Sequence, residues 1–133
     1  MTRAEQVVLV CEDNQDLREM AAFIIQADGF VVIEAARGQA VLPMVAQHKP
    51  DVILLDIRLP DIDGYEVLSS LMALSREEAP NVIVFSAKSR PEDVEMALSL
   101  GASEFVEKPF TVDALLFAVR RQAARAALKR ESV

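Results

Sequence analysis

Three acidic residues, one serine and one lysine are the residues of this chain best placed to do chemistry together. Glu12 and Asp13 directly follow one short apolar run, and Asp56 follows another. Ser86 and Lys108 come at the ends of two more. Clustered carboxylates repel one another, so they need a cation to coexist. Oxygen ligands alone suit Mg²⁺, and a nearby lysine supplies a positive charge for a further anion, most naturally a phosphoryl group.

Other reactive residue types are scarce. The chain has one histidine and one cysteine, which excludes most zinc sites and any Ser-His-Asp hydrolase. A single cysteine forms no internal disulfide, so we expect a protein of the reducing cytoplasm. Cys11 lies inside an apolar run, and we expect it to be a small buried residue rather than a functional thiol.

The elements that must position these residues follow a repeating order. Short apolar runs alternate with helical patterns at Val7–Cys11, Val31–Ala35, Val52–Leu55, Val82–Phe85 and Phe105–Val106. The first four runs are nearly continuous, which is typical of parallel strands covered by helices on both faces. The pattern predicts an α/β fold, a doubly wound (βα)5 domain whose ligands bind at the carboxyl ends of the strands. An acidic residue after a strand is often only a helix cap, but four of these five runs end in charged or hydroxyl groups.

Residues typical of helix ends support the predicted helices. Asn14 and Thr111 are expected to cap the first and fifth helices at their N-termini. Gly29 and Gly101 are expected to end the first and fourth. Pro43 leaves the second helix open: either the helix starts at Pro43, or it starts earlier and is kinked there.

Length and composition indicate one domain. The chain has 133 residues, of which 52% are hydrophobic, enough to form a core. We expect a single domain over residues 1–133, with a core from about residue 5 to about 122 and a last helix that reaches about residue 130. No apolar run approaches the roughly 20 residues that span a bilayer, and no secretory signal is visible, so no membrane partner is expected.

Charge is distributed unevenly along the chain. The net charge is −7; residues 1–110 carry 9 basic and 19 acidic side chains, and residues 111–133 carry 5 and 2. An acidic body repels phosphates, so we expect no direct binding of nucleic acid. The basic end could contact an acidic partner, but cations near the C-terminus of a last helix are better explained by the helix dipole.

Taken together, the motifs resemble a known family. They are Cys11-Glu12-Asp13-Asn14, then Asp56-Ile57-Arg58-Leu59-Pro60 with Gly64, then Ser86-Ala87, and finally the run from Gly101 to Phe110 that contains Lys108-Pro109. This pattern resembles the receiver domains of response regulators in two-component signalling, phosphoacceptor domains of the chemotaxis-regulator type. The resemblance covers essentially the whole chain. It implies a flavodoxin-like fold with a five-stranded parallel sheet of order 2-1-3-4-5 and helices on both faces.

The resemblance also implies the phosphorylation chemistry. Asp56 would be the phosphoacceptor, taking a phosphoryl group from a phosphohistidine of a sensor histidine kinase or a histidine phosphotransfer protein. Glu12, Asp13 and Asp56 would hold Mg²⁺ together with the backbone carbonyl of Arg58. The domain would then be a signalling module rather than an enzyme, catalysing only its own phosphorylation and dephosphorylation.

Further residues around this site receive roles from the same resemblance. Ser86 and Lys108 would bind phosphoryl oxygens, and Phe105 would be the aromatic switch residue that moves inward with Ser86. Arg58 and Lys88 occupy positions that line the approach of water to the phosphoryl group. Two cations there would bind phosphoryl oxygens and slow hydrolysis.

The resemblance implies one peptide conformation and one output surface. The Lys108-Pro109 bond is expected to be cis. The face formed by the fourth helix, the fifth strand and the fifth helix is expected to bind a downstream effector or a second copy of the chain.

Two other functions share this architecture. A small Mg²⁺-dependent phosphatase or phosphotransferase would also form an aspartyl-phosphate, but such enzymes usually carry a second aspartate two residues after the first, where this chain has Arg58. A flavin- or nucleotide-binding domain would need a glycine-rich first turn, whereas residues 12–16 here are anionic and would repel phosphates.

Overall fold

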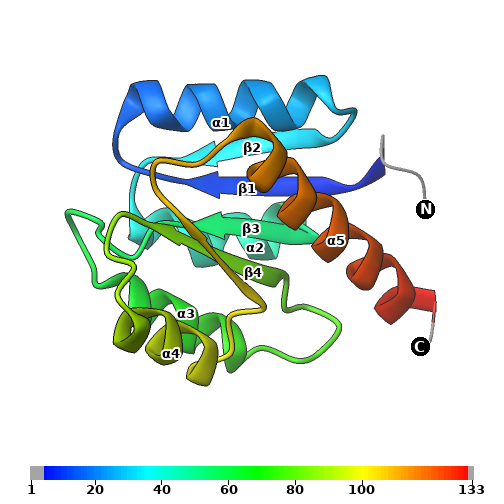
Figure 1. Cartoon of the computed structure of the whole chain (residues 1–133). Helices are drawn as coiled ribbons and strands as arrows, with labels where there is room; N and C mark the ends of the chain where they lie inside the picture. Colours follow the sequence, from blue (N-terminus) through cyan, green and yellow to red (C-terminus); the bar gives the residue numbers. More distant parts are fainter. Residues whose placement is uncertain (1–4, 132–133) are drawn as a thin grey trace.

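The computed structural model describes residues 5–131 and contains a five-stranded parallel sheet (Figure 1). The strands are β1 (Val7–Cys11), β2 (Val31–Ala35), β3 (Val52–Leu55), β4 (Asn81–Ser86) and β5 (Glu104–Glu107). The helices are α1 (Gln15–Ala27), η2 (Gly38–Ala40), α2 (Val41–His48), α3 (Gly64–Met72), α4 (Pro91–Ser99) and α5 (Val112–Glu131). The strand order is β2-β1-β3-β4-β5, so the predicted doubly wound, flavodoxin-like fold is confirmed.

Helices cover both faces of the sheet, which explains the continuous apolar strands. Successive residues of a strand point to opposite faces. In β1, Val8 and Val10 pack with α1 and α5, while Leu9 and Cys11 pack with α2, α3 and α4. Figure 1 shows α1 and α5 on one side of the sheet and α2, α3 and α4 on the opposite side. No polar face is needed, so the strands do not alternate.

The predicted caps are present. The side chain of Asn14 accepts a hydrogen bond of 2.9 Å from the backbone N–H of Leu17, and Thr111 Oγ1 accepts one of 3.0 Å from that of Ala114. Gly29 and Gly101 adopt φ values of 103° and 111°, a region that disfavours side chains. These residues fix where α1, α4 and α5 begin or end.

The second helix begins before Pro43. The one-turn helix η2 leads directly into α2, which starts at Val41, so a start at Pro43 is wrong. Proline is tolerated here because the first four N–H groups of a helix have no partner within the helix. The side chain of Asp61 supports this entry by accepting hydrogen bonds of 2.9 Å from the N–H groups of Gly38 and Gln39.

Basic residues attach α5 to the rest of the chain. Arg120 pairs with Asp28 through two hydrogen bonds of 2.8 and 2.6 Å, and Arg121 pairs with Glu104. Near the end of α5, Lys129 donates a hydrogen bond of 2.9 Å to the carbonyl of Ala79. These three basic residues of α5 therefore make contacts within the chain.

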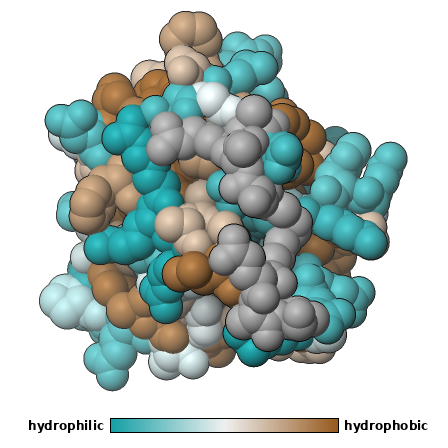
Figure 2. Space-filling model, turned by 90° about the vertical axis from the view of Figure 1, so that its right-hand side faces the viewer, coloured by the Kyte–Doolittle hydropathy of each residue, from teal (hydrophilic) through white to brown (hydrophobic). Residues whose placement is uncertain are grey.

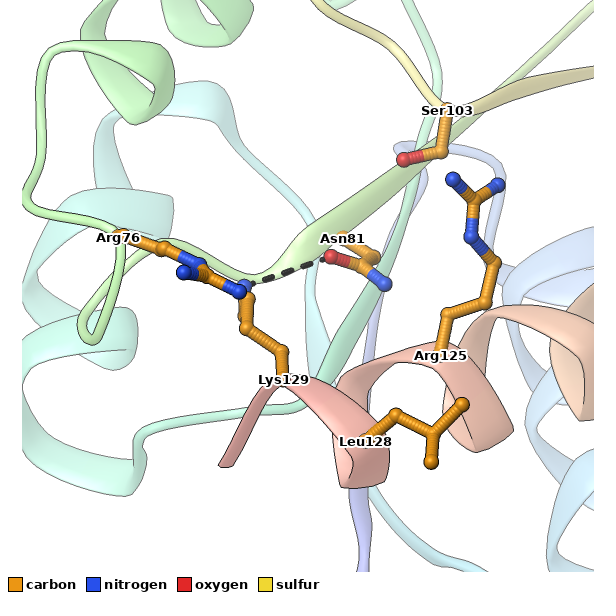
Figure 3. Close-up of a pocket in the computed structure, with 6 residues that line it drawn as sticks. All are labelled: Arg76, Asn81, Ser103, Arg125, Leu128 and Lys129. Carbon is orange, nitrogen blue, oxygen red and sulfur yellow. Dashed lines mark hydrogen bonds between the residues drawn. The ribbon is translucent and has the colours of Figure 1, made fainter. Parts of the chain in front are cut away.

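The end of the sheet at which the strands begin is a different surface from the predicted site. It holds an open cavity of about 570 Å³ (Figure 3), lined by Arg76, Asn81, Ser103, Arg125, Leu128 and Lys129. Figure 2 shows the molecule from this side, with small apolar patches separated by hydrophilic residues. Within residues 5–131, no helix is long and apolar enough to cross a bilayer.

Candidate functional site

The register of the sheet brings the predicted acidic residues together. Cys11 of β1 pairs with Leu55 of β3, so the residues that follow them, Glu12 and Asp56, emerge side by side. Carboxylate oxygens of Glu12, Asp13 and Asp56 all lie within 4.8 Å of one another. Glu12 and Asp56 are 1% and 3% exposed, whereas Asp13 is exposed at the rim. The structure thus places these three acidic residues together at the carboxyl edge of the sheet.

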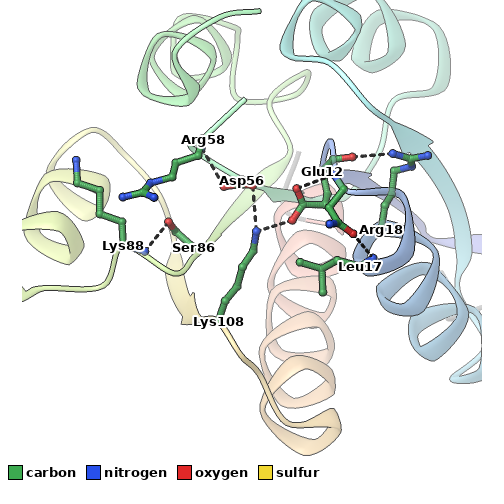
Figure 4. Close-up of polar contacts among 9 residues, drawn as sticks. Glu12, Leu17, Arg18, Asp56, Arg58, Ser86, Lys88 and Lys108 are labelled. Carbon is green, nitrogen blue, oxygen red and sulfur yellow. Dashed lines mark hydrogen bonds and ion pairs between the residues drawn. The ribbon is translucent and has the colours of Figure 1, made fainter. Parts of the chain in front are cut away.

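Lys108 joins two of these carboxylates (Figure 4). Its ammonium nitrogen lies 3.0 Å from Oδ2 of Asp56 and also contacts Oε1 of Glu12. The same nitrogen lies 4.5 Å from the centre of the Phe85 ring, a favourable position for a cation. The Lys108-Pro109 bond is cis, as predicted.

The remaining oxygen of each buried carboxylate is held by its own loop. Oδ1 of Asp56 accepts a hydrogen bond of 2.9 Å from the N–H of Arg58, and Oε2 of Glu12 accepts one of 3.2 Å from the N–H of Asn14. Each carboxylate thus has one oxygen on its loop and one on Lys108. These contacts fix the orientation of both groups.

This arrangement fits a divalent cation. Three carboxylates face one ammonium, so the cluster carries two negative charges in excess. A hydrogen bond with Glu12, then burial, then the charge of Glu12 raise the pKa of Asp13 above its usual value, against the opposite effect of Lys108. Neighbouring carboxylates repel one another unless a cation lies between them, and carboxylate oxygens are ligands that Mg²⁺ prefers.

Gly64 is required by close packing next to this site. A Cβ atom at Gly64 would lie 2.2 Å from Cα of Ile57, on the loop between Asp56 and Arg58. Only glycine lets α3 approach this loop so closely. Asp63 caps α3 by accepting a hydrogen bond of 2.9 Å from the N–H of Tyr65.

Ser86 lies beside this cluster at the end of β4 and is fully buried. Its Oγ accepts a hydrogen bond of 3.0 Å from the N–H of Lys88, and its carbonyl accepts one of 2.9 Å from the N–H of Lys108. The structure therefore places Ser86 at the end of β4 and Lys108 directly after the end of the adjacent strand β5.

The two predicted cationic neighbours differ in their contacts. Arg58 is exposed, and Figure 4 shows its side chain extending toward the side of Ser86 and Lys88. The ammonium of Lys88 is paired with Oδ1 of Asp93 in α4, 3.7 Å away. The role of both residues in phosphate lifetime stays a prediction.

Phe105 and Cys11 occupy the interior next to the site. Phe105 of β5 is half-buried and packs against the core on the α2–α4 face of the sheet. Cys11 is buried, and burial followed by the charge of Asp56 raises the pKa of its thiol to about 12. Cys11 is thus a small core residue, as expected.

Sequence reasoning missed two residues that contact this site and one that binds its neighbour Lys88. Phe85 lies under the Lys108 ammonium, and Arg18 donates a hydrogen bond of 2.9 Å to the carbonyl of Glu12. Asp93 binds Lys88 and Arg90. The spacing Arg90-Pro91-Glu92-Asp93, with an acid at the third helical position, could have indicated a helix-capping role for Asp93.

Comparison with known proteins decides the family. The sequence model of the response regulator receiver domain matches residues 8–120. The chain belongs to the response regulator receiver family. It is 35% identical to the transcriptional regulatory protein YxdJ of Bacillus subtilis over 120 residues, covering 90% of this chain and 51% of that protein. It is 39% identical to the KDP operon transcriptional regulatory protein KdpE of Escherichia coli over 125 residues, covering 94% and 52%.

Solved receiver structures agree. The chemotaxis response regulator CheY4 of Vibrio cholerae superposes with a TM-score of 0.81 at 26% identity, covering 88% of this chain and 98% of that one. The chain spans about half the length of the curated relatives it matches. As a receiver domain, it is a module of two-component signal transduction, and the family match does not favour the phosphatase alternative.

Proposed function

We propose that Asp56 accepts a phosphoryl group from a phosphohistidine of a sensor histidine kinase or a histidine phosphotransfer protein. The observation that carries this proposal is that each oxygen of the Asp56 carboxylate has a different hydrogen-bond donor. Oδ1 of Asp56 accepts a hydrogen bond from the N–H of Arg58, and Oδ2 accepts one from the ammonium of Lys108. The surrounding cluster has an excess of negative charge. A carboxylate so oriented, at the carboxyl edge of the sheet, is a fixed nucleophile.

The transfer needs no general base. A carboxylate is ionised at neutral pH, so an oxygen of Asp56 attacks phosphorus directly. The new O–P bond forms as the P–N bond to histidine breaks, and the imidazole nitrogen keeps that electron pair. With a proton on the second ring nitrogen of the phosphohistidine, the products are an acyl phosphate and a neutral imidazole.

Charge that develops on the phosphoryl oxygens is neutralised by groups around Asp56. The ammonium of Lys108 lies within hydrogen-bond distance of Asp56, and the hydroxyl of Ser86 lies on the adjacent strand. Glu12, Asp13, Asp56 and the carbonyl of Arg58 would hold Mg²⁺. When bound, this cation supplies further positive charge for the transferring group.

The donor protein would meet an apolar surface beside Lys108. A cavity of about 310 Å³ lies there, lined by Leu17, Met20, Ala87, Lys108, Pro109 and Phe110. Met20 is 48% exposed. Apolar contacts at this position would hold a protein donor while its phosphohistidine reaches Asp56. The acidic body of the chain disfavours direct contact with nucleic acid.

Output is proposed to pass from Ser86 to the face of α4, β5 and α5. Ser86 is hydrogen-bonded to the loop that leads into α4. Phe105 of β5 is half-buried and pairs with Val84 of β4, two residues before Ser86. A phosphoryl group adds about −1.5 to −2 charges, which draws the Ser86 hydroxyl and gives Phe105 room to move inward. This face would then bind a downstream effector or a second copy of the chain, and the domain would act as a switch.

A small phosphodonor tests the proposal. The protein, Asp56→Asn and the control Asp113→Asn are incubated with acetyl phosphate and Mg²⁺, and their intact masses are measured. Asp113 is an exposed acid of α5 and leaves the cluster intact. We expect one added phosphoryl group in the wild type and the control and none in Asp56→Asn. Equal labelling of Asp56→Asn would overturn the assignment.

A further inference from the structure

A buried acid at the start of α4 has contacts that the phosphorylation site does not explain. The side chain of Asp93 is only 7% exposed. Its Oδ2 accepts hydrogen bonds of 3.2 Å from both the N–H and the Nε–H of Arg90. Its Oδ1 lies 3.7 Å from the ammonium of Lys88. The two oxygens therefore bind different partners.

Helix capping accounts for only one of these oxygens. An acid at the third helical position that accepts from the N–H preceding the helix is half of a capping box, and that contact uses Oδ2. The contact of Oδ1 with Lys88 adds nothing to the cap. It ties the loop before α4 to the first turn of the helix.

This loop also carries the Ser86 contact. The N–H of Lys88 donates a hydrogen bond of 3.0 Å to Oγ of Ser86, so one residue is held by Asp93 through its side chain and by Ser86 through its backbone. In Figure 4 the Lys88 side chain leads away from Asp56. Lys88 lies two residues from Ser86, and its ammonium is directed by Asp93 to the helix rather than to the site.

We propose that Asp93 is a positioning residue that holds the Lys88 ammonium away from Asp56 and thereby shortens the lifetime of the phosphorylated state. This inference rests on the proposed phosphorylation of Asp56. With the charge of Asp93 removed, the ammonium is released and pairs with the phosphoryl oxygens. An ion pair to the phosphoryl ground state opposes hydrolysis, so the acyl phosphate decays more slowly.

A double-mutant comparison tests the pathway through Lys88. Wild type, Asp93→Asn, Lys88→Gln and the double variant are phosphorylated with acetyl phosphate and Mg²⁺, the donor is removed, and loss of the phosphoryl group is followed by intact mass. Asparagine keeps an oxygen acceptor for the cap but not the charge. We expect Asp93→Asn to slow the decay about two- to fivefold, the range of a partly exposed ion pair. In the Lys88→Gln background the same substitution leaves the decay rate unchanged.

Conservative variants separate positioning from folding. Asp93→Glu keeps the charge and restores the wild-type rate, and Glu92→Gln removes an exposed neighbouring charge that pairs only with Arg90 among the described contacts and leaves the rate unchanged. Asp93→Ser replaces Asp93→Asn if that variant does not fold. Equal slowing in both Lys88 backgrounds, no slowing, or faster decay overturns the inference. Failure of every variant to take up phosphate contradicts the proposed function instead.

Discussion

The ammonium nitrogen of Lys108 lies 3.0 Å from Oδ2 of Asp56, although the two residues are 52 positions apart in the chain. The same ammonium contacts Glu12, so one cation serves two buried carboxylates. It is the only positive charge that the described contacts place directly on Asp56. The stability of the cluster and its readiness to accept a phosphoryl group therefore depend on the same side chain.

Replacing Lys108 should weaken both the fold and the reaction. Lys108→Met leaves Glu12 and Asp56 buried without their ammonium. Breaking a fully buried ion pair costs about 3–5 kcal/mol, and we expect a smaller loss here because the Lys108 side chain is 15% exposed. Urea unfolding measures the loss, which Mg²⁺ should partly restore. A variant as stable as wild type without Mg²⁺ would contradict the electrostatic role of Lys108.

Magnesium should stabilise the folded chain through Asp13. Binding to the folded state alone adds about 2.7 kcal/mol at a concentration one hundred times the Kd. Asp13→Asn removes an exposed ligand, and a tenfold loss of affinity lowers that stabilisation by about 1.4 kcal/mol. Thermal unfolding with and without Mg²⁺ measures the difference.

Asp16→Asn is the matched control for this experiment. Asp16 is an exposed acid in the first turn of α1, outside the acidic cluster. Its substitution should leave the Mg²⁺ effect intact. An equal Mg²⁺ effect in Asp13→Asn and wild type would remove Asp13 from the metal site.

The stability that Asp61 contributes through its hydrogen bonds to the turn before α2 should depend on pH. Hydrogen bonds from the N–H groups of Gln39 and Gly38 hold the pKa of Asp61 below its usual value. A carboxyl whose pKa is lower in the folded chain stabilises the fold above its unfolded pKa and loses that effect as the pH falls through the folded value. Asp61→Ala should therefore be less stable than wild type at pH 6, and the difference should shrink below about pH 4. Urea unfolding across this range checks the trend, and a constant difference would argue against it.

A larger residue at Gly64 should disturb the loop that orients Asp56. Gly64→Ala places a Cβ against the backbone of Ile57, so the loop must move and the hydrogen bond from Arg58 to Asp56 must lengthen or break. We expect a loss of stability together with slower phosphorylation, measured by urea unfolding and intact mass. Ser69→Ala, on the exposed side of α3, is the control. A Gly64→Ala protein with wild-type stability and labelling would show that the close approach is not required.

The parts of the site that could be predicted are those fixed by local sequence. Continuous apolar runs locate the strands because both faces of the sheet are covered, and the residues after each run must then meet at one edge. Glu12, Asp56, Ser86 and Lys108 follow from this rule alone. The position of Phe85 under Lys108 does not, because it depends on which side chains meet in three dimensions.

Other features depend on contacts between distant segments. The start of α2 at Val41 is supported by Asp61, which binds the preceding turn from another loop. The direction of Lys88 is set by Asp93, and nothing in the sequence around Lys88 separates that contact from one with Asp56. Which of two acidic residues a lysine pairs with depends on the three-dimensional arrangement of the chain, and residue spacing in the sequence does not give that arrangement.

Direct localisation of the phosphoryl group tests the central claim. The protein is phosphorylated with acetyl phosphate and Mg²⁺, reduced with borohydride so that an aspartyl phosphate becomes homoserine, digested and sequenced by mass spectrometry. We predict homoserine at position 56, with no reduced residue at Glu12 or Asp13 and no product when Mg²⁺ is removed. Reduction at Glu12 or Asp13, or unmodified Asp56 in a phosphorylated protein, would contradict the account.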